Sequence, residues 1–254
     1  MNPQHIELVK STVPVLRENG VALTTYFYQR MLKNNPELNN VFNLDHQSSG
    51  RQPRALAAAV LAYAENIENP SVLAKAIEHI TTKHVSLDIR PEQYSIVGEN
   101  LLHSISEVLD VPMDAELIAA WKAAYFQLAD ILIGVEQQKY QQLAEQSGGW
   151  AGWRQFEISL VELTTEGKRF HLTAQDGKTI SSAEAGQFIS VKVKVPQQDL
   201  EQPQQFNLVA DQPQQSYVFD VKAEDTTSAL SVANILLNHY QTGDVVSVTA
   251  PVKR

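Results

Sequence analysis

The feature that most constrains the fold of this chain is a change of hydrophobic period near residue 147. Before that point apolar residues recur three or four positions apart, as on the buried face of a helix. After it they alternate at every second position, as in a strand. The change falls in the segment 147–153, where three glycines lie beside two tryptophans, and glycine clusters are typical of connections. We therefore predict two domains, residues 1–147 and 148–254.

The first domain is predicted to be all helical. Prolines stand where several helices should begin, because proline is well tolerated in the first turn of a helix. Gly20 is predicted to end the first helix. The longest helix is expected to begin after Pro112, with an apolar face that includes Trp121 and Leu132. A second helix is expected to follow Gly20, with Leu23, Phe27 and Met31 spaced by four, and a short segment at 36–42 comes after it. The other expected helices contain residues 54–67, 70–83 and 91–109.

The second domain is predicted to be a small antiparallel β-barrel with one helix. Alternating segments predict its strands, and an amphipathic segment predicts a helix at 227–240. The segment 197–215 is rich in glutamine and proline and is expected to be an exposed loop. The expected strands lie at 156–163, 170–172, 188–195, 217–221 and 245–248.

Composition excludes several classes of function. The chain contains no cysteine, which rules out disulfides, iron–sulfur clusters and cysteine-ligated zinc. Its net charge of −9 and the acidic character of both halves argue against nucleic-acid binding. With no apolar run of about 18 residues we expect no transmembrane helix, and without a signal-like N-terminus we expect a cytoplasmic protein.

Histidine and carboxylate are the remaining strong metal ligands. His79 and His84 lie in one predicted helix, but a spacing of five residues places them about 140° apart around its axis. They cannot both face one metal on a continuous helix. A lone histidine near a helix C-terminus, such as His84, is either a partner of the helix dipole or a metal ligand.

The first half carries a set of motifs spread over more than 100 residues. The predicted second helix and the corner after it contain Tyr28-Gln29-Arg30-Met31 and Asn35-Pro36-Glu37-Leu38. The later motifs are Gln52, Ala55-Leu56, Tyr63-Ala64, Asn66-Ile67-Glu68-Asn69, Lys83-His84, Pro91-Glu92-Gln93-Tyr94, Trp121, Ala124-Tyr125 and Glu136. In this order the motifs resemble those of the bacterial flavohaemoglobins, and the resemblance implies a globin fold that binds haem b.

The same resemblance implies the roles of the site residues. His84 would be the iron ligand on one side of the haem (the proximal side), with Tyr94 and Glu136 behind it, and a carboxylate there would make the imidazole more basic. Tyr28 and Gln52 would lie on the opposite, distal side and donate hydrogen bonds to a bound gas. Pro53 follows Gln52 directly, which predicts Gln52 at or before the first helical turn. Phe42 would pack against the haem, and Leu56 would line the gas pocket, although both are equally compatible with ordinary core packing.

The second half resembles the flavin barrel of the ferredoxin-reductase type, with departures. Where the family has Arg-x-Tyr-Ser, this chain has Gln204-Gln205-Phe206-Asn207, and Phe188 replaces a tyrosine. The hydroxyl-rich run 226–231 contains no glycine for close approach to phosphate. We therefore expect a degenerate FAD site. No dinucleotide fingerprint occurs and the nicotinamide-binding lobe of the family is not found, so no NAD(P) site is expected.

These features predict a haem b globin that binds O2, NO and CO and converts NO to nitrate, with electrons from a separate reductase. The alternative is a haem-based gas sensor or carrier whose barrel is a protein-interaction module. A third interpretation is a decayed or truncated gene product.

Overall fold

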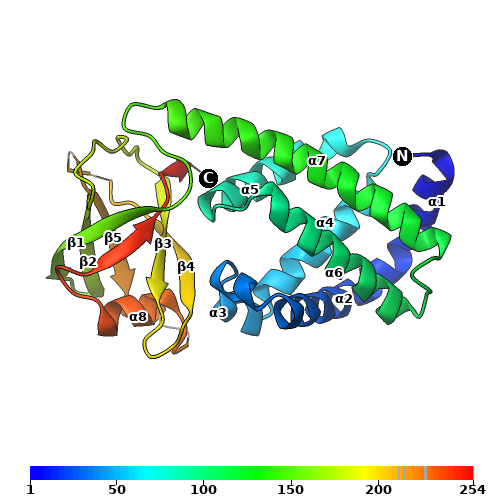
Figure 1. Cartoon of the computed structure of the whole chain (residues 1–254), viewed down its shortest axis with the longest axis horizontal. Coiled ribbons are helices and arrows are strands. Elements are labelled where there is room, and N and C mark those ends of the chain that lie inside the picture. Colours follow the sequence, from blue (N-terminus) through cyan, green and yellow to red (C-terminus); the bar gives the residue numbers. More distant parts are fainter. Residues whose placement is uncertain (211, 214, 226–227, 254) are drawn as a thin grey trace. The chain divides into compact units, whose positions relative to one another are not determined.

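The computed structural model describes residues 1–210, 212–213, 215–225 and 228–253 (Figure 1). Contacts divide the chain into two compact units. The first holds residues 1–36, 46–81 and 90–135, and the second holds residues 37–45, 82–89 and those from 136 onward. The second unit therefore includes three pieces of the helical half of the sequence: residues 37–45, residues 82–89 and the end of the last helix from residue 136. The predicted domain boundary after residue 147 lies between the last helix of that half and the first strand.

The first half is helical, as predicted. Residues up to Glu145 form a succession of helices with short connections. The helices are α1 (Pro3–Ser11), α2 (Val13–Asn34), η1 (Pro36–Asn40), α3 (Leu44–Ser48), α4 (Arg51–Glu65), η2 (Pro70–Leu73), α5 (Ala74–Ser86), α6 (Pro91–Leu109) and α7 (Glu116–Glu145).

Gly20 does not end a helix, so that prediction was wrong. Helix α2 continues through Gly20, which is buried against Ala57 of α4, and a Cβ at Gly20 would lie 3.5 Å from the Ala57 Cβ. The Thr24 hydroxyl donates to the Gly20 carbonyl at 3.0 Å and lies 2.8 Å from the Pro53 carbonyl. Close packing of α2 on α4 thus outweighs the cost of about 1 kcal/mol that glycine imposes inside a helix.

Helix α7 is the one described helix that is long and apolar enough to cross a membrane by length and composition alone. Its most apolar 18-residue window has a mean hydropathy of 1.3. The helix also carries fully buried side chains, among them Ile118, Trp121 and Ala124. A helix in the core of a helical domain has this character, and we interpret α7 as such a helix.

The second half forms the predicted antiparallel barrel. Its strands pair in the order β4-β3-β6-β1-β2-β5, and β7 pairs with β3. An antiparallel bridge between Leu208 and Phe219 joins the end of β4 to β5. The strands are β1 (Arg154–Leu163), β2 (Gly167–Ala174), β3 (Gln187–Lys194), β4 (Glu201–Asn207), β5 (Tyr217–Lys222), β6 (Val245–Val248) and β7 (Val252–Lys253).

The barrel helix is shorter than predicted. After the short turn η3 (Ala223–Asp225), α8 (Val232–His239) begins at Val232, where the Ser231 hydroxyl caps it by accepting from the Asn234 amide. Helix α8 packs against β3, β4 and β5. Thr226 and Thr227, at the start of the predicted helix and of the hydroxyl-rich run, lie outside the described residues.

The segment 197–215 is only partly the exposed loop that its composition predicts. Residues Glu201–Asn207 form β4, which pairs with β3 along its whole length. Pro203 is tolerated because β4 lies at one end of the strand order, and an edge strand can leave a backbone position without a donor. The error arises because three of the seven residues of this strand are glutamines, one of them the buried Gln202, so that the strand shows no hydrophobic alternation.

Gln202 shows how such an amide is accommodated. Its side chain is completely buried. Its Nε2 donates to the carbonyls of Asn39 and Glu201 at 2.7 and 2.8 Å, and its Oε1 accepts from the Leu44 amide at 2.9 Å. The amide thereby attaches the segment 39–44 to β4 within the second unit.

Replacing Gln202 by leucine is expected to lower the free energy of unfolding by about 2–4 kcal/mol, because it leaves buried backbone groups without partners. Urea denaturation checks this value. Gln155→Leu is the control, since Gln155 is exposed and should cost less than about 1 kcal/mol. Equal losses in the two variants would show that the buried amide has no special structural role.

Candidate functional site

His84 lies in the last turn of α5, and its imidazole is held by a carboxylate. The His84 Nδ1 is 2.8 Å from Oε1 of Glu136 on α7. The histidine side chain is 30% exposed, whereas that of Glu136 is only 4% exposed. With Nδ1 engaged by the carboxylate, Nε2 is the ring nitrogen that a metal can use. The structure thus brings together two residues 52 positions apart in the sequence.

The first unit brings together a second pair, Tyr28 of α2 and Gln52 of α4. Their side chains are hydrogen-bonded to each other. Tyr28 is 7% exposed, and this burial raises the pKa of its phenol well above the ordinary value, with the Gln52 hydrogen bond acting in the opposite direction. The phenol therefore keeps its proton at neutral pH and can act as a hydrogen-bond donor.

Gln52 lies in the first turn of α4, as Pro53 predicts. The helix begins at Arg51, directly after Gly50, whose φ of 68° is in the left-handed region. The Gln52 Oε1 accepts a hydrogen bond of 2.7 Å from Nε2 of Gln47. Gln47 is a supporting residue that the sequence analysis missed, and no spacing or motif pointed to it.

The remaining predicted site residues belong to both units. Tyr94 is buried on α6, and its carbonyl accepts a hydrogen bond of 2.7 Å from the Tyr125 hydroxyl. Leu56 is half-buried on α4 in the first unit. Phe42 is half-buried in the connection between η1 and α3 and belongs to the second unit with His84 and Glu136.

Three barrel residues stand at the positions of the family's flavin motif but carry side chains of different chemistry. Phe206 is 5% exposed, and its ring centre lies 4.8 Å from that of Phe219. Phe188 is buried as well. Neither ring carries a hydroxyl, and Gln204 carries no charge, so these three positions do not fit a site that contacts flavin through a phenol and its phosphate through a cation.

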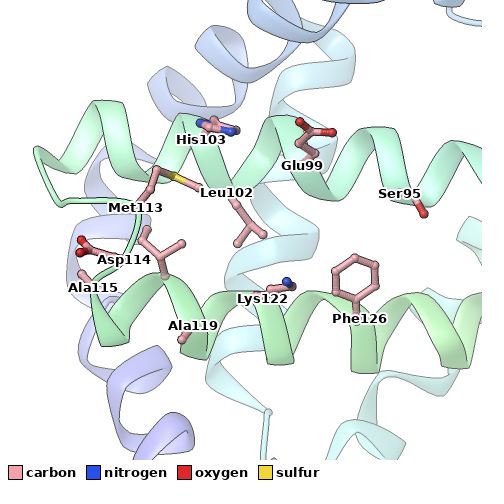
Figure 2. A pocket seen from close by; sticks show the side chains of 11 residues that line it. Ser95, Glu99, Leu102, His103, Met113, Asp114, Ala115, Ala119, Lys122 and Phe126 are labelled. Carbon is pink, nitrogen blue, oxygen red and sulfur yellow. The ribbon is translucent and has the colours of Figure 1, made fainter.

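A surface groove of about 440 Å³ lies between α6 and the start of α7 in the first unit. Figure 2 shows Leu102 between the two helices, with His103 and Glu99 on α6 and Lys122 and Phe126 on α7. The groove is lined by none of the predicted site residues. Its charged side chains are of both signs, which does not define a ligand class.

Comparison with known proteins agrees with the fold. The globin family profile matches residues 25–132. A bacterial globin of Campylobacter jejuni has a solved structure that matches with a TM-score of 0.53 and 38% identity, covering 55% of this chain and 99% of that one. The chain therefore belongs to the globin family through its helical half.

Over nearly its whole length the chain is a homologue of the flavohaemoproteins. It is 48% identical to the flavohemoprotein of Bordetella pertussis over 256 residues, which cover 99% of this chain and 63% of the relative. The flavohemoprotein of Rhizobium meliloti is 44% identical, with 96% and 62% covered. The chain thus spans somewhat less than two thirds of the length of these relatives.

The fold of the entire chain also matches a solved flavohemoglobin. The structure from Malassezia yamatoensis, described with bound FAD and heme, has a TM-score of 0.87 and 24% identity. The match covers 100% of this chain and 64% of that one. At 24% identity the likeness shows the fold alone, which is a globin followed by a flavin-type barrel.

Proposed function

We propose that this chain binds haem b through His84 and converts NO to nitrate. The observation that carries the proposal is the His84–Glu136 pair, a half-buried imidazole held through Nδ1 by a buried carboxylate. This donor set fits haem, because a single histidine whose other ring nitrogen is held by a carboxylate would be a suitable ligand for its iron. The names of the flavohaemoprotein relatives support the same cofactor.

Each remaining site residue has a part in this proposal. Glu136 holds the imidazole through Nδ1 and fixes its orientation, and Tyr94 would stand behind the histidine. The Tyr28 phenol, protonated and supported by Gln52, would donate a hydrogen bond to a partly negative ligand on the distal side. Phe42 would pack against the cofactor, and Leu56 would line the pocket that admits the gas.

Haem supplies an iron with an open coordination position for O2, NO or CO. In the proposed reaction one NO and one O2 take up one electron and give one nitrate. The electron comes from a separate reductase, and the protein acts in the cytoplasm. The proposed domains are a globin domain, residues 1–147, and a barrel, residues 148–254, whose FAD site is degenerate and which has no NAD(P) site.

Glu136→Gln is expected to raise the reduction potential of the bound iron. The amide keeps the size of the side chain but removes the negative charge next to the His84 imidazole, so the ligand donates less electron density. Spectroelectrochemical titration measures the potential. Glu145→Gln, at the exposed end of the same helix, is the control. An unchanged potential in Glu136→Gln would contradict the proposed role of the carboxylate.

The absorption spectrum of the purified protein tests cofactor binding. We expect a Soret band that shifts when dithionite and CO are added, without a flavin band. A protein that takes up no haem on reconstitution would contradict the proposal. A flavin band would contradict the degenerate FAD site and leave the haem assignment intact.

The alternative function is a gas sensor or carrier in which the barrel binds a protein partner. The observation that favours it is that His84 and the barrel belong to the same compact unit. Partner capture in the presence and absence of CO distinguishes the two functions. A partner whose affinity depends on CO favours the sensor, and identical capture in both states counts against it.

A further inference from the structure

The segment that carries His84 is anchored to the barrel through Ser86. We call residues 82–89 the proximal segment; it belongs to the second unit together with the barrel. Ser86 is completely buried. Its hydroxyl donates to the Lys83 carbonyl at 2.8 Å and accepts a hydrogen bond of 2.7 Å from Nε2 of Gln205 on β4. Gln205 is therefore a barrel side chain that reaches the last turn of the helix bearing the histidine.

A second strand connection reaches the same serine. Thr249 directly follows β6, and its hydroxyl donates to the Ser86 carbonyl at 3.2 Å. Thr249 is held in turn by β3, because its Oγ1 accepts from the Ser190 amide at 3.1 Å. Ser190 is paired with Gln205 across β3 and β4. Ser86, the last residue of α5, is thus hydrogen-bonded to two barrel residues that are themselves held by strand β3.

The residues on either side of His84 are fixed as well. The Lys139 ammonium donates to the Thr82 hydroxyl at 2.9 Å, and the Tyr140 hydroxyl donates to the Ile89 carbonyl at 2.8 Å. Val85 packs in a cluster with Tyr140 and Ala250. Among these contacts, the Gln205–Ser86 hydrogen bond joins a side chain of strand β4 to a side chain two residues from His84.

We infer that Gln205 is a positioning residue: acting through Ser86, it fixes the last turn of α5 and so the orientation of the His84 imidazole toward Glu136 and the iron. This inference rests on the proposed function of His84. It gives the barrel a role that does not depend on flavin, since the strand that matches the flavin motif also supports the histidine. The hydrogen bond of 2.7 Å is short and partly buried, and its loss is expected to let the turn move.

The test compares two variants that each remove one glutamine-to-serine hydrogen bond. Gln205→Leu removes the bond to Ser86. Gln155→Leu removes a bond of 2.9 Å to the Ser247 hydroxyl on the exposed side of the barrel. The readout is the iron–histidine stretching band in the resonance Raman spectrum of the reduced, haem-loaded protein. We expect this band to shift to lower frequency and to broaden in Gln205→Leu and to stay unchanged in Gln155→Leu.

A double-variant comparison tests whether the effect passes through Ser86. Ser86→Ala alone is expected to shift the band in the same direction, and Gln205→Leu is expected to add nothing on the Ser86→Ala background. Additive shifts would overturn the inferred route. In the haem-free protein, amide hydrogen exchange at residues 87 and 89 should also be faster in Gln205→Leu than in Gln155→Leu.

The outcomes separate this inference from the proposed function. An iron–histidine band that is identical in wild type and Gln205→Leu would overturn the positioning role while leaving His84 as the ligand. If the wild-type haem shows no histidine ligation, the proposed function fails and the inference fails with it. Faster exchange without a band shift would show that Gln205 only stabilises the helix, which also overturns the inference.

Discussion

His84→Gly is expected to abolish haem retention, from about one haem per chain in the wild type to almost none after gel filtration. The imidazole is the only protein ligand that the proposal assigns to the iron, and its loss also leaves the buried Glu136 carboxylate without its histidine partner. Soret absorbance per chain measures the loss. Free imidazole added during reconstitution should restore much of the haem, because it can occupy the space vacated by the side chain.

The matched control for this variant is His79→Gly. His79 lies on the same helix, α5, and is exposed, so the substitution costs similar helix stability without touching the proposed site. Full haem retention is expected in His79→Gly. Retention that is equal in the two variants would show that His84 is not the iron ligand.

Tyr28→Phe is expected to speed O2 dissociation from the reduced protein roughly 10- to 150-fold. A charge-assisted hydrogen bond from the phenol to the diatomic ligand contributes about 1.5–3 kcal/mol, and each 1.4 kcal/mol corresponds to a factor of ten. The phenol is suited to this role because burial keeps it protonated and Gln52 holds it in place. Stopped-flow displacement of O2 by CO gives the rate.

Tyr26→Phe provides the control for the distal side. Tyr26 lies on the same helix two residues earlier, and its exposed hydroxyl donates to Glu107 at 2.7 Å. Its removal should leave the O2 dissociation rate within about twofold of wild type, because the hydroxyl lies outside the proposed distal pair. If Tyr28→Phe dissociates O2 no faster than Tyr26→Phe, the phenol does not contact the ligand.

The succession of helices and strands could largely be predicted from the spacing of hydrophobic residues along the chain. Strand β6 has the bounds that alternation predicts, Val245–Val248. The spacing of hydrophobic residues did not predict the structure where polar or small residues are buried by specific contacts. The Gln202 side chain is completely buried and hydrogen-bonded to backbone groups, and Gly20 is buried where α2 meets α4. Neither arrangement leaves a periodic signal, because each depends on a partner distant in the sequence.

The site was predicted from resemblance rather than from spacing. His84 and Glu136 are 52 positions apart on different helices, so local pattern could not pair them, whereas the structure places their side chains 2.8 Å apart. The Gln205–Ser86 bond connects residues 119 positions apart and had no counterpart in the sequence analysis. Long-range polar contacts of this kind become visible only when the fold is known.

The most direct test of the central proposal is nitrate production over many turnovers. The haem-loaded protein is reduced, equilibrated with air, supplied with an added NAD(P)H-dependent reductase and exposed to NO, and nitrate is then counted per haem. The proposal predicts nitrate well in excess of haem when the reductase is present, and about one nitrate per haem when it is absent. One nitrate per haem under both conditions would contradict the enzymatic function and leave the protein as a gas carrier or sensor.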